Sequence, residues 1–297
     1  MHDSLVHLLP GPVVTDGAWG TQLQLAGLGP HEASDAWNLS HPSEVEQVGR
    51  AYVEAGSQVI LTNTLGANRI QLAHRALDDQ VEAINRAGVE LSKRAAAGRA
   101  QVFASLGPTG KILRLGQASV DDLLEVFGEQ ARALAAAGAD ALLLETFTDV
   151  EELVVGIRAA KQTGLPVVAS LVFDSGKHHD RTMMGETPEA AVQALLAAGA
   201  DVVGANCGRG IDGYIDVCRR MHAACDAPLW LKPNAGLPEI VDGRIRYRTT
   251  PEQFASRTLD LVAAGASFVG GCCGTNPAFL RAVVAAVTAL PSPGETT

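Results

Sequence analysis

The chain has 297 residues, of which 47% are hydrophobic and 19% are charged, so it has ample material for a folded core and is not generally disordered. Lys and Arg number 23 against 33 Asp and Glu, which gives a net charge of -10, and no basic run could form a nucleic-acid interface. No apolar stretch reaches the roughly 18 residues that a membrane span needs. The N-terminus carries no basic, apolar leader, and the cysteine count is an odd 5, so we expect a cytoplasmic protein with free thiols and no membrane or nucleic-acid partner.

Short apolar runs recur along the chain, and Ala-Gly phrases precede several of them. These phrases lie at 55–57, 137–140, 198–201 and 264–267, each after an Ala-rich amphipathic stretch. The pattern predicts a helix, a glycine cap in the left-handed conformation, and then a short buried strand. In chain order, the predicted strands start near residues 13, 59, 102, 141, 167, 202, 229 and 268.

The number and spacing of these strands predict the fold. Each interval is long enough for a crossover helix, and continuous apolar strands alternating with helices indicate a parallel sheet covered on both faces. Eight such units favour a single α/β domain, a (β/α)8 TIM barrel, over an open doubly wound sheet, which usually has fewer strands. We expect one domain over 1–297, with its core at about 12–290 and a flexible tail at 291–297.

In a barrel of this kind, functional groups gather where the strands end. Polar or thiol residues follow six of the predicted strands: Asp16-Gly17-Ala18-Trp19, Asn63, Glu145, Asn206-Cys207, Asn234 and Cys272-Cys273. Asp16 and Glu145 each end an apolar run. Each carboxylate either holds the ammonium group of a substrate or accepts N–H bonds within its own loop, and the residues alone favour neither reading.

Three cysteines at two strand ends indicate a metal site. Three thiolates hold one Zn²⁺ and leave its fourth tetrahedral position open, the arrangement of a catalytic site. Neighbours in a flat strand point to opposite faces, so Cys272 and Cys273 reach one metal together with Cys207 only if the backbone turns. Gly270, Gly271 and Gly274 provide that freedom.

A plainer reading treats these cysteines as small buried hydrophobic residues, a common fate of free thiols. The ligand count and the glycine-rich setting favour the metal. Cys218 and Cys225 differ, because they fall in and near the end of the helix after the sixth strand, and we predict that both serve only packing.

Together these segments resemble the zinc-dependent homocysteine S-methyltransferase family, over about residues 12 to 290. The resemblance is carried by Asp16-Gly17-Ala18-Trp19-Gly20-Thr21, Leu61-Thr62-Asn63-Thr64, Glu145-Thr146-Phe147, Asn206-Cys207, the Pro-Asn-Ala-Gly-Leu-Pro run at 233–238 and Gly270-Gly271-Cys272-Cys273-Gly274-Thr275. Within the family the chain is most similar to the homocysteine-binding module of cobalamin-dependent methionine synthase. Betaine– and S-methylmethionine–homocysteine methyltransferases are further relatives.

The resemblance implies a barrel that transfers a methyl group to the thiol of L-homocysteine and gives methionine. By position, it makes Cys207, Cys272 and Cys273 the zinc ligands. It assigns Asp16 and Glu145 to the homocysteine ammonium group.

The resemblance also implies further parts of the site. Backbone N–H groups near Gly17, Ala18 and Trp19 would bind the homocysteine carboxylate. Asn63, Asn206 and Asn234 would line the site without an assigned role.

The methyl donor stays open, as either a small donor or a methyl-corrinoid protein that docks as a separate chain. Trp19 and Trp37 either pack on a cationic donor or merely close the loop after the first strand. Two alternatives to the homocysteine reaction are a methyltransferase component that uses another thiol or corrinoid partner, and a barrel that binds zinc or a thiol without turnover.

Overall fold

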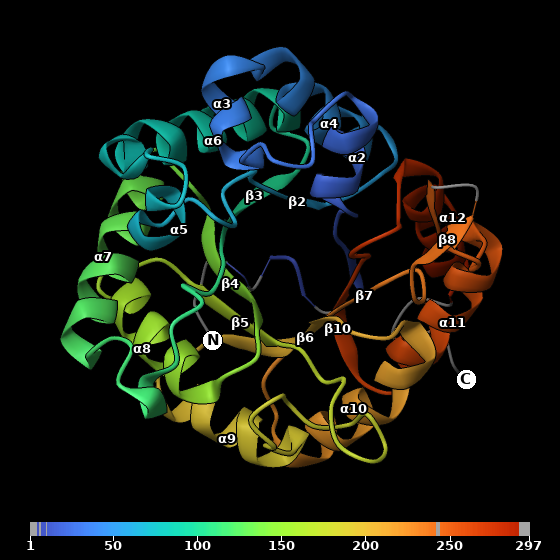
Figure 1. The fold of residues 1–297 in the computed structure, drawn as a ribbon. Coiled ribbons are helices and arrows are strands. Elements are labelled where there is room, and N and C mark those ends of the chain that lie inside the picture. Colours follow the sequence, from blue (N-terminus) through green and yellow to red (C-terminus); the bar gives the residue numbers. More distant parts are fainter. Residues whose placement is uncertain (1–4, 6, 10, 242–243, 291–297) are drawn as a thin grey trace.

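A computed structural model describes residues 5, 7–9, 11–241 and 244–290 and shows a ring of parallel strands enclosed by helices (Figure 1). The strands are β1 (Val13–Val14), β2 (Val59–Leu61), β3 (Gln101–Leu106), β4 (Ala141–Phe147), β5 (Val167–Leu171), β6 (Val202–Cys207), β7 (Leu229–Pro233) and β10 (Ala266–Val269). They pair in the order β1-β10-β7-β6-β5-β4-β3-β2. A parallel bridge between Thr15 and Val59 joins the two ends of this order. The (β/α)8 prediction is confirmed, and each strand starts at or close to its predicted residue.

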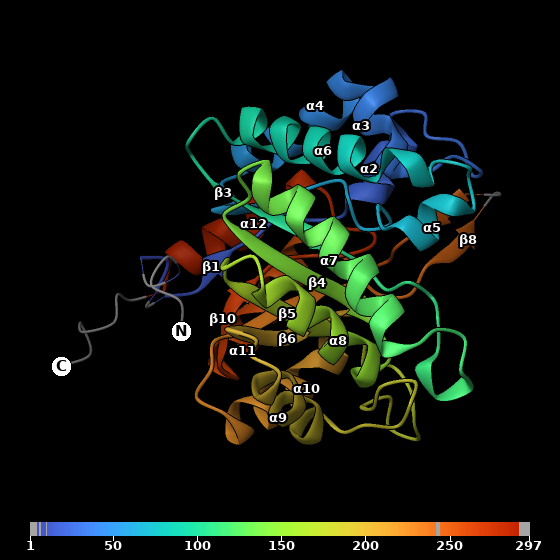
Figure 2. The ribbon, with the colours of Figure 1, turned by 90° about the vertical axis from the view of Figure 1, so that its left-hand side faces the viewer.

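Helices cover the outside of the barrel, and several run alongside its strands (Figure 2). The long ones are α4 (Pro42–Glu54), α6 (Val81–Ala96), α7 (Val120–Ala136), α8 (Val150–Lys161), α9 (Pro188–Ala197), α10 (Ile211–Ala224), α11 (Pro251–Ala263) and α12 (Pro277–Thr288). The predicted cap glycines Gly56, Gly138, Gly199 and Gly265 all have positive φ, between 92° and 110°. They end helices in the left-handed conformation that glycine tolerates best, as the Ala-Gly phrases predict.

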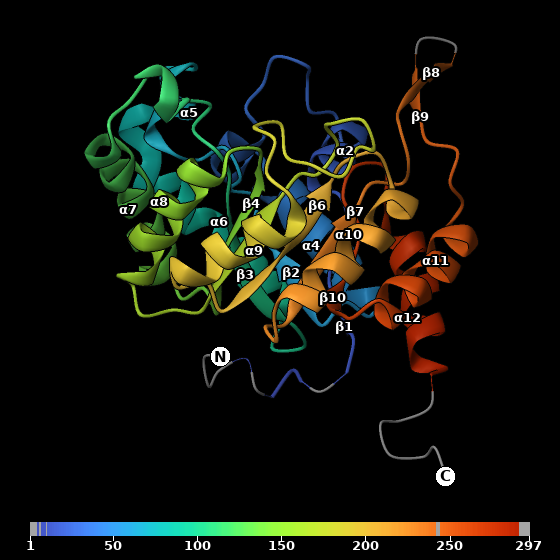
Figure 3. The ribbon, with the colours of Figure 1, turned by 90° about the horizontal axis from the view of Figure 1, so that it is seen from below.

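Shorter elements lie in the loops that follow three strands. They are α2 (Trp19–Leu25) and α3 (Trp37–Ser40) after β1, α5 (Arg69–Ala73) after β2, and the hairpin β8 (Glu239–Val241) and β9 (Arg244–Arg246) after β7. Figure 3 shows the hairpin rising from the same side of the barrel as α5. These loops surround the mouth of the barrel at the carboxyl ends of the strands.

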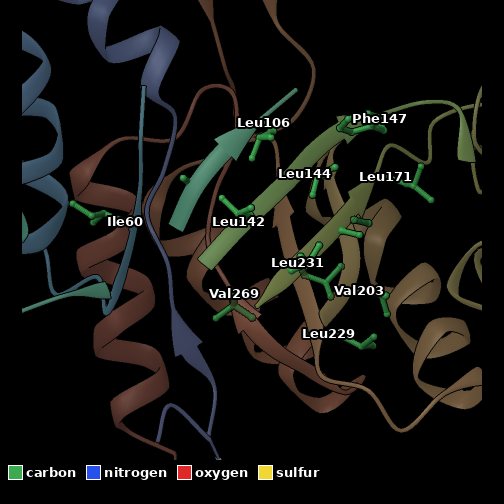
Figure 4. Packing of buried hydrophobic residues seen from close by; sticks show 14 of the residues in the cluster. Ile60, Leu106, Leu142, Leu144, Phe147, Leu171, Val203, Leu229, Leu231 and Val269 are labelled. Atoms are coloured by element: carbon green, nitrogen blue, oxygen red, sulfur yellow. The ribbon is translucent and has the colours of Figure 1, made fainter. Parts of the chain in front are cut away.

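Side chains alternate between the two faces of each strand. Ile60, Leu142 and Leu231 belong to the large cluster that packs strands against helices, part of which Figure 4 shows. Leu143, which follows Leu142, and Trp230, which precedes Leu231, belong instead to the cluster inside the barrel. There the rings of Phe103, Trp230 and Phe268 lie with centroids 5.5 to 6.4 Å apart and fill the interior with apolar volume.

The same period of two makes the next inward layer polar. Ser105 comes two residues after Phe103, Glu145 two after Leu143, and Lys232 two after Trp230. All are buried, and they lie where the strands end, above the aromatic rings. The sequence pattern thus builds an apolar plug with a polar layer on top of it.

No helix in the described part of the chain is long and apolar enough to cross a membrane. The tail predicted at 291–297 lies outside the described residues.

Candidate functional site

A cavity of about 210 Å³ lies at the carboxyl ends of the strands, where function was predicted. Its wall includes residues 17–21 after β1 and 61–65 at the end of β2, together with Glu145, Lys232 and Cys272. Cavities that take drug-sized ligands measure roughly 300 to 1,000 Å³. This smaller volume suits a ligand the size of an amino acid.

The structure brings the three predicted cysteines together beside this cavity. The sulfur atoms of Cys207, Cys272 and Cys273 all lie within 4.8 Å of one another. Zinc–thiolate bonds of about 2.3 Å place sulfurs roughly 3.8 Å apart around a tetrahedral ion. The donor set therefore fits one soft metal ion, with room for a fourth ligand from the cavity that Cys272 and Cys273 line.

Backbone turns at the strand ends aim these thiols at one point. Cys207 has φ +66°, a left-handed conformation that is uncommon outside glycine. The N–H of Cys272 donates to the Pro233 carbonyl at 2.8 Å, and Gly274 has φ +84°, so the chain turns sharply around the vicinal pair. Gly270 serves a different purpose, because a Cβ there would come within 2.0 Å of the Thr15 hydroxyl.

Two asparagine side chains reach the sulfur cluster. Asn234 donates from Nδ2 to the Cys207 sulfur at 3.5 Å, and Asn206 lies 4.0 Å from the Cys272 sulfur. Hydrogen bonds from Cys272, Cys273 and Asn234 lower the pKa of Cys207, although burial opposes them. The same bonding raises the pKa of Cys272. This hydrogen bonding favours the thiolate form of Cys207 over that of Cys272.

Asn206 also fixes the carboxyl end of β4. Its Oδ1 accepts from the Thr146 N–H at 2.9 Å and the Ser170 hydroxyl at 2.7 Å, and its Nδ2 donates to the Thr146 hydroxyl at 2.8 Å. Thr146 has φ +67° and lines the cavity directly after Glu145. Asn63 has a comparable task, donating to the Ser34 carbonyl and the Asn38 side chain.

Asp16 is held by three donors. Its carboxylate accepts from Lys232 Nζ at 2.5 Å, from Trp19 Nε1 at 2.7 Å and from the Leu61 N–H at 2.7 Å. It is fully buried, and Lys232 rather than Asp16 lines the cavity. The prediction that Asp16 contacts a ligand ammonium group stays a prediction, and the observed partners give this carboxylate a structural task as well.

Glu145 faces the cavity with its oxygens less engaged. Its Oε1 accepts from the Ser105 hydroxyl at 2.6 Å. Burial raises the pKa of Glu145, while the nearby Lys232 charge and the Ser105 hydrogen bond lower it, with a net upward shift. A positive ligand group beside Glu145 would offset the cost of burying its charge.

Lys232 carries the positive charge opposite Glu145. Burial lowers the pKa of Lys232, but the charges of Asp16 and Glu145 outweigh it and raise the value overall. The ammonium group also lies 5.8 Å from the centre of the Trp230 ring, within range of a cation–π contact.

The loop after β1 closes one side of the cavity. Gly17, Ala18 and Trp19 all line it, as expected. The Ala18 N–H already donates to the Thr275 hydroxyl at 3.2 Å, and its carbonyl accepts from the Tyr52 hydroxyl at 2.7 Å. Carboxylate binding by these backbone groups stays a prediction.

The remaining residues singled out in the sequence lie away from the sulfur cluster. Trp37 is buried and stacks on His41, with ring centroids 4.1 Å apart, and it is not part of the cavity wall. Cys218 is fully buried in the core, where burial raises its pKa to about 12. Cys225 packs partly buried against the same core. Both cysteines lie where the packing prediction puts them.

Sequence reasoning missed Lys232, Ser105 and Thr146 as members of the site. A usable signal existed for Lys232, since a lysine inside an apolar strand needs a buried anionic partner. Counting by two from Trp230 also places it on the inner face of the barrel.

Comparison with known proteins agrees with this geometry. A model of the family described as homocysteine S-methyltransferase matches residues 13–287. Methionine synthase of Mycobacterium tuberculosis is 31% identical over 300 residues, which cover 95% of this chain and 25% of that protein. The chain thus spans about a quarter of the length of this curated relative.

Solved structures give the same result along the whole barrel. The homocysteine methyltransferase MmuM from Escherichia coli, in a metallated form, is 26% identical with a TM-score of 0.80, over 95% of this chain and 99% of that chain. Its oxidized form is 25% identical with the same TM-score, over 96% and 99%. With a matching family model over nearly its full length and a three-cysteine cluster at the barrel mouth, the chain belongs to the homocysteine S-methyltransferase family.

Proposed function

We propose that this chain transfers a methyl group to the sulfur of L-homocysteine, giving methionine, with Zn²⁺ held by Cys207, Cys272 and Cys273. One observation carries the proposal: three sulfur atoms lie within 4.8 Å of one another beside a small cavity whose wall bears Glu145. Family membership supplies the acceptor, and the soft donor set supports zinc over a hard cation such as Mg²⁺.

Different residues of the site bind the metal and orient the substrate. Zn²⁺ at this site supplies a Lewis acid that keeps an alkyl thiol deprotonated at neutral pH. Cys272 and Cys273 present the metal position to the cavity, and Asn234 orients Cys207. The Glu145 carboxylate accepts hydrogen bonds from the substrate ammonium group and thereby holds the amino acid in one orientation.

The reaction itself is a displacement at carbon. The homocysteine sulfur forms a new bond to the methyl carbon as the bond between that carbon and the donor breaks, and the donor leaves with the electron pair. The thiol proton is lost to solvent before transfer. The enclosed wall fixes the sulfur and leaves only the open side for the donor.

X-ray absorption at the zinc edge tests the metal and the acceptor together. The reduced, zinc-loaded protein should show three sulfur ligands and one lighter ligand, and L-homocysteine should change this to four sulfurs. A shell that ignores L-homocysteine but gains sulfur from another thiol would instead support the reading with a different acceptor. A protein that retains no zinc contradicts the proposal.

The donor is identified by turnover. Methylcobalamin, S-methylmethionine and glycine betaine are each supplied with L-homocysteine, and methionine is measured. Methionine from methylcobalamin alone would support a methyl-corrinoid protein as partner, whereas methionine from either small molecule supports direct entry of that donor. Zinc and homocysteine binding without methionine from any donor would support the reading of a binding barrel without turnover.

A further inference from the structure

We propose that Lys232 anchors the α-carboxylate of the acceptor, so that the cavity recognises an amino-acid zwitterion between Lys232 and Glu145. The inference deepens the proposed function and rests on it, because it takes homocysteine as the acceptor. It replaces the expectation that backbone N–H groups near Gly17, Ala18 and Trp19 bind this carboxylate, since the Ala18 N–H already donates to the Thr275 hydroxyl.

The first argument is the number of hydrogen-bond donors on Lys232. An ammonium group has three N–H bonds. Among the described residues, Lys232 Nζ donates only to Asp16. Its side chain is 3% exposed, so water reaches it little, and two donors are left without a protein acceptor. Buried charged donors are costly unless they are paired, and Lys232 lines the cavity, so a ligand in the cavity is the natural acceptor.

The second argument is that the ammonium group is held in place. Asp16 binds Nζ at 2.5 Å, and Asp16 is itself fixed by Trp19 and the Leu61 N–H. This network uses one of the three N–H bonds of the Lys232 ammonium group and restrains the position of that group. A ligand therefore finds a preorganised cation and has little ordering cost to offset.

The third argument is charge complementarity. Of the residues that line the cavity in the described part of the chain, Lys232 alone is basic and Glu145 alone is acidic. An α-amino acid carries one group of each sign. The thiolate cluster next to the cavity would repel a carboxylate. Lys232, although it is paired with the buried Asp16, is the basic side chain on the cavity wall that offsets this repulsion.

The test compares ligands that lack one charged group. Isothermal titration of the zinc-loaded protein uses L-homocysteine, 3-aminopropane-1-thiol, which lacks the carboxylate, and 4-sulfanylbutanoate, which lacks the ammonium group. In the wild type, we expect loss of the carboxylate to weaken binding about 10- to 100-fold. In Lys232→Met, L-homocysteine and 3-aminopropane-1-thiol should bind almost equally, whereas the penalty for losing the ammonium group should persist.

Matched variants separate recognition from folding. Lys232→Arg should keep most of the preference for the carboxylate. Glu145→Gln should show the reverse pattern. The affinity lost with a ligand that lacks the ammonium group (the ammonium penalty) should shrink, and the affinity lost with a ligand that lacks the carboxylate (the carboxylate penalty) should stay. Lys161→Met removes a partly buried lysine outside the cavity, paired with Asp201 at 2.8 Å, and should leave both losses of affinity unchanged. If the unpaired Asp16 carboxylate prevents Lys232→Met from folding, the double variant Asp16→Asn, Lys232→Met removes both charges. The ratio of its affinities for L-homocysteine and 3-aminopropane-1-thiol should again be close to one.

The outcomes are distinct. A carboxylate penalty that stays at the wild-type value in Lys232→Met and in the double variant overturns the assignment, even if all affinities fall together. A wild type that binds none of the three thiols overturns the proposed function and this inference with it. A wild type that binds L-homocysteine, with a penalty independent of Lys232, overturns the inference alone.

Discussion

Asn234 donates its side-chain amide hydrogens both to the sulfur of Cys207, at 3.5 Å, and to the carbonyl of Gly208, at 2.7 Å. One amide thus connects the thiol to the backbone that follows it, and so orients the sulfur toward Cys272 and Cys273. Metal ligands that are oriented by such hydrogen bonds bind more tightly than ligands without them.

Asn234→Ala should therefore weaken zinc binding about 10- to 100-fold while leaving all three sulfurs in place. Competition against a chromogenic chelator measures the affinity. Asn276→Ala is the control, since Asn276 caps α12 through the Ala278 N–H and its loss should cost about 1 kcal/mol of stability without touching the metal. Equal zinc affinity in Asn234→Ala and the wild type would count against the orienting role.

Ser105→Ala should shift the pH dependence of homocysteine binding. Ionised Glu145 holds the ligand ammonium in our proposal, so affinity falls when acid protonates this carboxylate. The Ser105 hydrogen bond lowers the pKa of Glu145, and its removal raises that pKa further. The loss of affinity should then begin at a higher pH than in the wild type, as titrations across a pH series will show. Ser170→Ala, which removes a buried hydroxyl bound to Asn206 instead, should not move the profile.

Asp35 should make stability depend on pH. Burial raises the pKa of Asp35 to about 6 from 3.8, although the Gly66 N–H lowers it. The folded state therefore keeps this proton where the unfolded chain loses it, and the stabilisation present below about pH 4 is lost as the pH rises through about 6. Urea unfolding should show the wild type losing up to about 3 kcal/mol relative to Asp35→Asn over this range. A difference that is constant with pH would refute the shift.

Zinc should protect a defined set of thiols from alkylation. Cys207, Cys272 and Cys273 should become reactive when a chelator removes the metal, and mass mapping will identify them. Cys225 should react in both states because it is partly exposed. Cys218 should react in neither state, since it is fully buried and its pKa is about 12. Protection of Cys225 in place of a predicted ligand would contradict the assignment.

The barrel could be predicted because its signals are local. Each strand is a short apolar run, and glycines such as Gly138 and Gly199 mark the helix ends with the positive φ that the structure shows. The cysteine cluster was predictable for the same reason, since its members end two strands and a barrel brings strand ends together.

The charge network was not predictable in this way. Asp16 and Lys232 are 216 positions apart, and their contact depends on the register of strands that only the closed barrel sets. The sequence shows that Asp16 ends an apolar strand, where a carboxylate needs a hydrogen-bond partner. It does not show that Lys232, Trp19 and the Leu61 N–H already donate to this carboxylate. Roles of this kind belong to pairs of residues and are invisible in either residue alone.

The position of the three sulfurs along the chain also bears on folding. Cys207 ends β6 while Cys272 and Cys273 follow β10, and β7 lies between these strands in the sheet. A metal ion bound to all three would act as a cross-link that closes the loop containing α10, β7, the hairpin and α11. The last quarter of the barrel would then share one cooperative unfolding unit with the metal, so that zinc depletion lowers the mechanical and proteolytic resistance of this segment before it affects β3 to β5.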